Sequence, residues 1–333
     1  MNVGIIGAGF IGAKRAEVIM KFKKDRIVSI FDTDLVRSTA LAQKVGCAIA
    51  KSSTDIFKDK NIEAVIIATV SNVSAPLCLE AIRYKKNILC EKPLGINYLE
   101  AKKIYTYAQK NKVMLKVGFN HRFHLAVRKA HDLVAKGAIG ELMYMRAVYG
   151  HGGRKGYDLE WRMNEKFSGG GELLDQGVHI LDLFRWFLGE FKEGMAFCEN
   201  MFWDKSKLDD NAFCTLRTFD GKVAQMHVSA TQWKNRFMID IFGKRGYINI
   251  EGKGGSYGRE TLKIGRRKEL GTRPAEQDFF YDRDTSWEEE WKNFRSSIAK
   301  KIQPNGNGFD GMMANKLIAG LYSSSKNKKI INF

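Results

Sequence analysis

The segment that most constrains the fold lies near the start of the chain, where the apolar run Val3–Ile6 leads into "GAGFIG" at positions 7–12 and then into a helix-forming stretch. Gly7 permits a tight turn, Gly9 lets the backbone approach a pyrophosphate, and Gly12 lets the helix pack closely on the strand. The pyrophosphate would lie against the free N–H groups of the helix N-terminus. Glycine-rich turns are common, but a strand before and a helix after make this one specific. We expect dinucleotide contacts from Gly7, Gly9, Phe10, Ile11 and Gly12.

A second apolar strand, "RIVSIFD", ends at Asp32, about 20 residues further on, where dinucleotide-binding proteins place an acid. A carboxylate there accepts hydrogen bonds from both hydroxyls of the adenosine ribose and repels a 2′-phosphate, which favours NAD over NADP. An alternative is that Asp32 is only a turn residue before the helix "LVRSTALAQKVG". Asp34 fits the N-cap of that helix better. The nearby Arg37 could still contact a cofactor phosphate.

Strands and helices continue to alternate as far as residue 120. Apolar strands are expected in "EAVIIAT" (63–69), in "KNILCEKP" ending at Pro93, and in "VMLKVGF" (113–119), with helices over 76–84 and 97–111. This alternation predicts a parallel, doubly wound α/β sheet. Ligands of such sheets bind at the carboxyl ends of the strands. Further cofactor contacts are therefore expected from Thr69, Asn72, Glu91 and Lys92.

Lys92 is the most informative of these residues, because it follows a strand end and is held by a proline. Its ammonium could hydrogen-bond a substrate oxygen and stabilise negative charge on it. Most loop lysines are merely solvated, however, and the adjacent Glu91 could be only an ion-pair partner.

The pattern changes after Asn120. A helix over 124–136 precedes a long strand, "GELMYMRAVYGHGG", and a polar, aromatic loop over 152–167. Five short strands follow, in "MAFCENMF", "NAFCTLRTF", "KVAQMHVSATQW", "FMIDIFG" and "GYINIEG", and helices close the chain over 286–301 and 310–325. These strands predict a mostly antiparallel sheet. We expect a Rossmann domain over 1–120 and an α+β substrate and oligomerisation domain over 121–333, whose C-terminal helices can pack back on the first.

One apolar segment, "SGGGELLDQGVHILDLFRWF" (168–187), carries three titratable groups. As a single helix it would place Asp175, His179 and Asp182 on one face, at i, i+4 and i+7. Buried carboxylates are costly unless paired or functional. His179 can exchange a proton near neutral pH, and Asp175 can hydrogen-bond the same substrate oxygens or the imidazole. Asp182 is the more deeply apolar position and is expected to be structural.

Two other interpretations of this segment stay open. His179 could be a core histidine hydrogen-bonded to one of the two aspartates, or the Asp/His pair could bind a metal ion. A metal needs further ligands, and no HExxH or cysteine cluster supplies them, so no metal site is expected. Substrate contacts are expected from polar and aromatic loop residues, together with Asp175 and His179: Asn120, Arg122, Tyr149, His151, Arg154, Trp161, Arg162 and Trp233.

The composition of the chain limits which kinds of partner it is expected to bind. There is no apolar run of about 18 residues for a membrane span and no secretory signal. Five scattered cysteines suit reduced thiols in a cytoplasm. The net charge of +18 could attract nucleic acid, an anionic membrane or an acidic substrate. The lysines are spread along the chain, apart from the short run at 326–329. No nucleic acid or membrane partner is therefore expected, and the charge reflects a lysine-rich composition or steers an anionic ligand.

Taken together, these motifs resemble the Gfo/Idh/MocA oxidoreductases, named for glucose–fructose oxidoreductase, inositol dehydrogenase and MocA. The resemblance spans the whole chain and rests on "GIIGAGFIG", "EKP" at 91–93, "GFNHRFHLAVRKA" from 118, "WR" at 161–162 and "GGGELLDQGVHILD" from 169. It implies a Rossmann domain, an open antiparallel sheet that commonly forms dimer or tetramer contacts, and catalytic roles for Lys92, Asp175 and His179. The family's "ATPN" loop differs here, where the chain has "ATVSN".

The activity that this resemblance implies is hydride transfer between a nicotinamide, NAD in preference to NADP, and a CH–OH carbon of a sugar, a sugar derivative or a cyclic polyol. His179 would exchange the hydroxyl proton, Lys92 would polarise the oxygen and Asp175 would orient both. Two alternatives are an NAD-dependent glycosidase that oxidises its substrate only transiently and a non-catalytic NAD-binding regulator. Among the candidate substrates, the basic net charge favours an anionic sugar.

Overall fold

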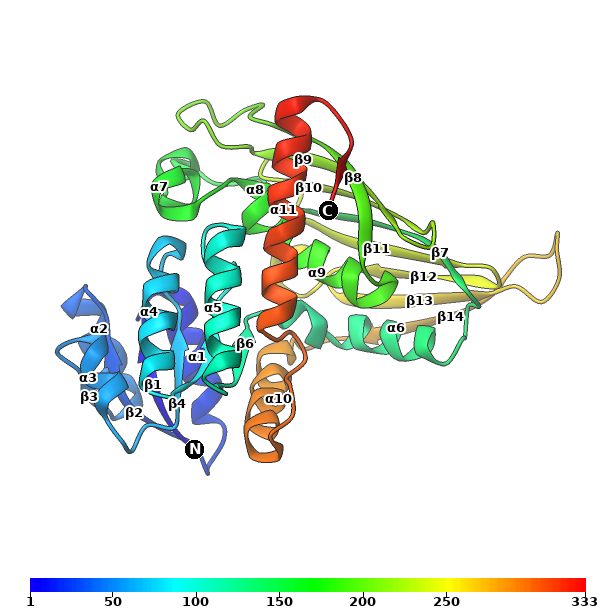
Figure 1. Ribbon diagram of the computed structural model, residues 1–333. Helices are drawn as coiled ribbons and strands as arrows, with labels where there is room; N and C mark the ends of the chain where they lie inside the picture. The colour runs from blue at the N-terminus through cyan, green and yellow to red at the C-terminus, as the bar shows by residue number, and fades with distance from the viewer. The chain divides into compact units, whose positions relative to one another are not determined.

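The computed structural model describes all 333 residues, which divide into two compact units (Figure 1). Unit 1 consists of Met1–Asn120 and Trp287–Asn315, and unit 2 of His121–Ser286 and Lys316–Phe333. The stretch 121–333 that we expected to form one domain is therefore shared between the units. Its residues 287–315 belong to unit 1.

Unit 1 is built on a parallel sheet of six strands in the order β3-β2-β1-β4-β5-β6. This is the strand order of dinucleotide-binding doubly wound sheets. From β1 the chain adds strands toward one edge, as β2 and β3, and then from β4 onward toward the other edge. The predicted parallel α/β sheet is confirmed. The strands are β1 (Asn2–Ile6), β2 (Arg26–Phe31), β3 (Ala48–Ile49), β4 (Ala64–Ile67), β5 (Asn87–Cys90) and β6 (Leu115–Val117).

Helices supply the apolar surface against which these strands are buried. In β4 every side chain is at most 1% exposed, which explains why a parallel strand is a continuous apolar run. Helices α4 and α5 lie side by side (Figure 1). α4 begins at Ser71, earlier than the expected residue 76, so that Asn72 lies in its first turn. The helices are α1 (Phe10–Met20), α2 (Leu35–Val45), α3 (Ser53–Lys58), α4 (Ser71–Arg83), α5 (Tyr98–Lys110), α10 (Ser286–Lys300) and α11 (Gly308–Asn327), which continues from unit 1 into unit 2.

Unit 2 contains a nine-stranded sheet in the order β14-β13-β12-β11-β7-β10-β9-β8-β15, in which only β7 and β10 are parallel neighbours. The predicted, mostly antiparallel sheet is confirmed. Sequence patterns did not indicate β13, β14 or β15. β14, "AEQDFFY", is mostly exposed and lacks an apolar face. The strands are β7 (Leu142–Gly150), β8 (Phe191–Glu199), β9 (Asn211–Thr218), β10 (Val223–Ser229), β11 (Arg236–Gly243), β12 (Gly246–Glu251), β13 (Glu260–Arg266), β14 (Ala275–Tyr281) and β15 (Ile331–Asn332).

Helices cover this sheet on its buried side: α6 packs against β12, β13 and β14, and α9 against β7 and β10. In β9, Ala212, Cys214 and Leu216 are buried whereas Phe213 between them is exposed, as expected for a half-buried antiparallel strand. The elements outside the sheet are η1 (Asn120–Phe123), α6 (Leu125–Ala135), η2 (Tyr157–Leu159), η3 (Trp161–Met163), α7 (Glu165–Ser168), α8 (Glu172–Asp175), α9 (Gly177–Leu188) and η4 (Gly255–Tyr257).

The segment 168–187 is not one helix, and this part of the prediction was wrong. α8 ends at Asp175 and α9 begins at Gly177, with Gln176 between them. The N–H of His179 donates to the carbonyl of Gln176 at 3.1 Å, a tighter i→i−3 bond at the start of α9. Glycine at 177 favours such an interruption, because it is a weak helix former. Asp175 therefore belongs to a different helix from His179 and Asp182.

None of the helices is both long and apolar enough to cross a membrane.

Candidate active site

The glycine turn after β1 has the geometry that its sequence predicts. Gly7 has a φ of +99°, and a Cβ there would lie 2.2 Å from the carbonyl oxygen of Ala68. A Cβ on Gly12 would lie 1.9 Å from the carbonyl oxygen of Gly7, so only glycine lets α1 start this close to the turn. A Cβ on Gly9 would meet nothing within 4 Å. Gly9 is thus not required by the protein's own packing, which leaves room at the N-terminus of α1 for a ligand.

Asp32 faces this turn from the end of β2. Its Oδ2 accepts a hydrogen bond from the N–H of Ala8 at 2.6 Å, and its Oδ1 accepts one from Asp34 at 2.8 Å. The predicted N-cap role of Asp34 is confirmed, because Asp34 Oδ1 accepts from the N–H groups of Val36 and Arg37. Arg37 pairs with Asp34 at 3.0 Å. The carboxylate of Asp32 is therefore fixed beside the glycine turn.

The strand ends next to β1 carry the other predicted cofactor residues of unit 1. Thr69 follows β4, and Asn72 lies in the first turn of α4. The Asn72 side-chain oxygen is buried with no hydrogen-bond partner within the chain, and a buried acceptor without a partner is costly. Together with the room at Gly9, this acceptor makes the residues present fit a bound dinucleotide.

Glu91 and Lys92 follow β5. Glu91 accepts a hydrogen bond from Nε of Arg15 at 2.8 Å. Its carboxylate therefore has a buried partner on α1, and its expected contact with the cofactor stays a prediction. Lys92 is partly buried at the start of the loop between β5 and α5.

In unit 2, Asp175 and His179 lie on either side of the break between α8 and α9. Asp175 Oδ2 lies 3.5 Å from Nε of Arg162, and the two side chains are 20% and 34% exposed. His179 is 5% exposed and stacks on the ring of His121, with 3.9 Å between the ring centroids. A partly exposed carboxylate and a buried imidazole thus lie one helical turn apart in the sequence and differ in their access to solvent.

His121 is a neighbour of His179 that the sequence interpretation missed. Its ring also lies 5.2 Å from that of Tyr149 and 5.5 Å from that of His124. Nδ1 of His124 lies 3.1 Å from the buried carboxylate of Glu260. The signal was present in "GFNHRFH", where two histidines three residues apart follow a strand end, but nothing in the pattern shows that one of them stacks on a residue 58 positions later.

Glu172 is a second missed residue, a buried carboxylate one turn before Asp175. Its Oε1 accepts a hydrogen bond from the Tyr157 hydroxyl at 2.7 Å and lies 3.6 Å from Nε2 of His151. Burial lowers the pKa of His151, with the nearby arginines 154 and 162 acting in the same direction. His151 is thus favoured as a neutral imidazole.

Tyr149 and Tyr257 are neighbours beside these groups, with 5.6 Å between their ring centroids. Burial raises the pKa of Tyr149 well above its usual value, with the charges of Asp175 and Glu172 adding to the effect. Burial raises the pKa of Tyr257 to about 12, and the charges of Glu172 and Asp175 act in the same direction. Both hydroxyls therefore stay protonated and can donate hydrogen bonds at physiological pH.

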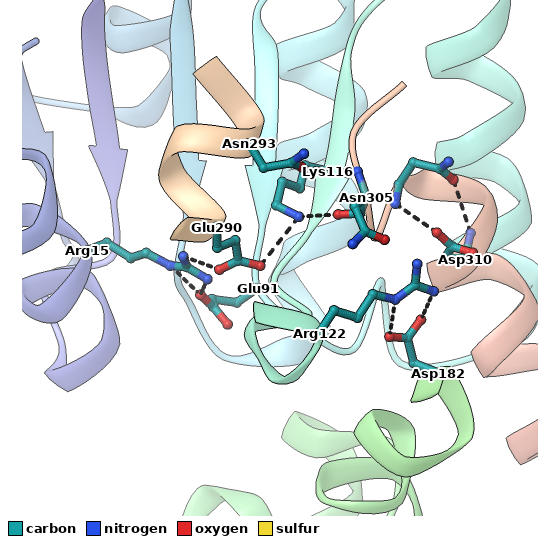
Figure 2. A network of polar contacts seen from close by, with 10 residues as sticks. Arg15, Glu91, Lys116, Arg122, Asp182, Glu290, Asn293, Asn305 and Asp310 are labelled. Atoms are coloured by element: carbon teal, nitrogen blue, oxygen red, sulfur yellow. Dashed lines mark hydrogen bonds and ion pairs between the residues drawn. The ribbon is translucent and has the colours of Figure 1, made fainter. Parts of the chain in front are cut away.

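Arg122 and Asp182 form a pair buried within unit 2 (Figure 2). Arg122 Nε and Nη2 donate to the two oxygens of Asp182 at 2.7 and 2.6 Å, and the residues are 3% and 1% exposed. Asp182 is therefore structural, as expected. Arg122 is the other member of this pair, and its expected contact with the substrate stays a prediction.

The other predicted substrate residues lie in different surroundings. Arg154 pairs with Glu160 and has a side chain 65% exposed. Arg162 lies over the ring of Trp161, 4.5 Å from its centroid. Trp233 is 66% exposed and contacts Phe202. Asn120, which ends the first segment of unit 1, is buried. The substrate roles of these residues stay predictions.

A parallel sheet in this strand order, with a glycine turn after its first strand and an acid after its second, defines the class of dinucleotide-binding α/β proteins. Comparisons with known proteins agree. Residues 1–119 match the model of the oxidoreductase family with an NAD-binding Rossmann fold, and residues 127–249 match the GFO/IDH/MocA C-terminal domain. The chain belongs to the Gfo/Idh/MocA family of NAD-binding oxidoreductases.

Named relatives cover nearly the whole chain. A myo-inositol 2-dehydrogenase of Thermotoga maritima is 28% identical over 324 residues, which are 94% of this chain and 93% of that protein. A 1,5-anhydro-D-fructose reductase of Ensifer adhaerens is 29% identical, over 93% of this chain and 91% of that protein. Among solved structures, levoglucosan dehydrogenase in complex with NADH superposes with a TM-score of 0.91 at 22% identity, over 100% of this chain and 98% of that one. This last likeness concerns the fold alone.

Proposed function

We propose that this chain is an NAD-dependent dehydrogenase or reductase that acts on a CH–OH carbon of a sugar, a sugar derivative or a cyclic polyol. The observation that carries the proposal is the buried imidazole of His179, which stacks on His121 and lies one helical turn after the carboxylate of Asp175 in the sequence, in a protein whose other unit fits a dinucleotide. An imidazole can take and return a proton near neutral pH. Oxidation of an alcohol requires such a group, because the hydroxyl proton must leave as the carbonyl forms.

The residues that would hold the cofactor are those of the glycine turn, with Asp32, Thr69 and Asn72. When bound, NAD supplies the hydride acceptor of the reaction. Asp32 would accept hydrogen bonds from the adenosine ribose. NAD is favoured over NADP, because the 2′-phosphate of NADP would meet the carboxylate of Asp32.

The chain's own catalytic groups are Lys92, Asp175 and His179. His179 removes the proton from the reacting hydroxyl, and Lys92 donates a hydrogen bond to the same oxygen and stabilises the negative charge that develops on it. Asp175 orients the substrate hydroxyl and is in turn held by Arg162. The hydroxyls of Tyr149 and Tyr257, which stay protonated, serve as hydrogen-bond donors to the substrate.

The substrate class rests on relatives whose names refer to inositol and anhydrofructose. Further proposed contacts come from Asn120, Trp161 and Arg162. The arginine and the net charge of +18 favour an anionic sugar among the candidates.

The direct test is a panel of myo-inositol, free hexoses, hexose phosphates and nucleotide sugars, scored by NADH formation from NAD. We expect NADH to accumulate with at least one member and the rate with NADP to be lower. Aryl glycosides in the same panel test the transient-oxidation alternative. Release of the aryl group without net NADH, and without activity on any alcohol, would contradict the proposal.

A further inference from the structure

Lys92 lies in a loop whose two flanks are both held by the C-terminal segment 287–315 of unit 1, nearly 200 residues away in the sequence. The segment comprises most of α10 and the first part of α11. One of its side chains, Asn315, bonds the backbone just after Pro93 directly, and another, Glu290, is linked through Arg15 to Glu91, the residue before Lys92.

On the first flank, a chain of buried charges ends at Glu91 (Figure 2). Arg15 on α1 donates Nε to Glu91 at 2.8 Å and Nη1 to Glu290 on α10. Glu290 also lies 3.5 Å from Nζ of Lys116 on β6. Nζ of Lys116 in turn donates to the backbone carbonyl of Asn305 at 2.5 Å. α10 is thus tied to α1, to β6 and, through Arg15, to the residue preceding Lys92.

This group of four charges is built into the fold. Arg15, Lys116 and Glu290 are each at most 1% exposed, and the two cations balance the two carboxylates, as burial of charge requires. Gly118 makes the room, since a Cβ there would lie 2.7 Å from Oε2 of Glu91. Glu91 can therefore shift only if its buried partners shift with it.

On the second flank, one amide group holds three carbonyl groups. Nδ2 of Asn315, on α11, donates to the carbonyl oxygens of Leu94 at 3.1 Å, Gly95 at 3.3 Å and Asn97 at 3.2 Å. Asn315 is 2% exposed. These bonds fix the backbone immediately after Pro93, so that the loop is held on both sides of Lys92.

We propose that Glu290, Arg15 and Asn315 are positioning residues for Lys92, and that the segment 287–315 is part of the catalytic apparatus through them. The inference rests on the proposed function of Lys92. The ammonium of Lys92 stands at the end of a four-carbon stem, and the backbone position of residue 92 sets which points that stem can reach. A shift of about 1 Å at a reacting group can cost about a hundredfold in rate.

The test compares Asn315→Leu and Glu290→Gln with the wild type, using a responsive alcohol from the panel. Both changes nearly preserve side-chain shape. We expect kcat to fall about tenfold to a hundredfold, with the Kd of NAD unchanged. The matched control is Arg295→Gln, which also removes a charge from α10. In the wild type Arg295 pairs with Asp25 at 2.9 Å and not with the Lys92 loop, so this variant should keep the wild-type kcat.

A double-mutant comparison separates positioning from a general structural effect. In a Lys92→Ala background, Asn315→Leu and Glu290→Gln should cause no further loss of kcat/KM, because their effect is exerted through the lysine. The same fractional loss in both backgrounds would overturn the inference, as would wild-type kcat in both single variants. Glu290→Gln carries the comparison if Asn315→Leu does not fold. Full activity of Lys92→Ala itself would instead overturn the proposed role of Lys92.

Discussion

At the scale of single residues, similar side chains in one short segment have different tasks, and burial separates them. Asp182 is 1% exposed and fully engaged by Arg122, whereas Asp175 is partly exposed and bound at one side by Arg162. The sequence indicated this division, because Asp182 lies among the larger apolar residues. It could not indicate Arg122 as the partner of Asp182, or His121 as the partner of His179, since these contacts join positions about 60 residues apart.

The structural role of Asp182 gives a stability prediction. Asp182→Ala leaves the Arg122 guanidinium buried without its carboxylate, which should lower the free energy of unfolding by about 3–5 kcal/mol. Urea unfolding measures the change. The control is Glu141→Ala, which breaks the exposed pair with Lys244 and should cost about 1 kcal/mol or less. Equal losses in the two variants would refute this role.

Asp209 gives a prediction about pH. Burial raises its pKa to about 6, although hydrogen bonds from the N–H of Leu173 and the hydroxyl of Tyr322 act in the opposite direction. In the folded protein the carboxyl group of Asp209 therefore stays protonated up to about pH 6, whereas in the unfolded chain it loses its proton at about pH 4. The free energy of unfolding should fall as pH rises between these values, by about 2–3 kcal/mol from this group.

The measurement for Asp209 is the free energy of unfolding of the wild type and of Asp209→Asn, taken at several pH values across this window. Subtracting the two cancels the other titrating groups. The wild type should lose stability relative to the variant as pH rises. A difference that does not change with pH would show that Asp209 does not titrate there.

At the scale of elements, the parallel sheet was predictable because each buried strand is an apolar run followed by a helix. The antiparallel sheet was less predictable from the sequence. Exposed strands such as β14 lack that signal, and the break at Gln176 between α8 and α9 depends on local backbone geometry within an apolar stretch that reads as continuous helix. The strands that precede Asp32, Thr69 and Lys92 were predicted for the same reason that the sheet was, although β5 ends at Cys90 and not at the expected Pro93.

The glycine turn gives a matched pair of predictions at this scale. Gly9 has a φ of −69°, which alanine adopts readily, and a Cβ there meets nothing in the protein. Gly9→Ala should therefore keep the wild-type Tm but weaken NAD binding about tenfold, a loss of about 1.4 kcal/mol. In Gly12→Ala the new Cβ would collide with the carbonyl of Gly7, so both the Tm and the affinity for NAD should fall. Binding is measured by calorimetry and Tm by circular dichroism. Unchanged NAD affinity in Gly9→Ala would contradict the assignment of this turn.

At the scale of the whole molecule, the sequence allowed the C-terminal helices to pack back on the first domain, but it did not indicate which of their residues form the contacts of the segment 287–315 with unit 1. α10 was expected from its amphipathic pattern, but its buried Glu290 pairs with Arg15, 275 positions earlier. A periodic pattern reports which face of a helix is buried and not what buries it. The positions of Arg15, Glu290 and Asn315 around the Lys92 loop required the three-dimensional structure.

The expected self-association through the sheet of unit 2 is also a prediction at this scale. Phe197 and Phe213 face each other on adjacent strands and are 53% and 40% exposed, and the ring of Phe213 stacks on that of His227. Apolar rows of this kind are typical of subunit contacts. Phe213→Glu should dissociate the oligomer, as measured by sedimentation velocity. A wild-type chain that sediments as a monomer would refute the prediction.

The most direct test of the central claim is the rate of NADH formation by His179→Ala with a responsive alcohol, measured beside the Kd of NAD. Removal of the proton acceptor should lower kcat by about 100-fold or more, while the Kd of NAD stays at the wild-type value. Wild-type kcat in this variant, or a loss of NAD affinity that accounts for the whole loss of rate, would contradict the account.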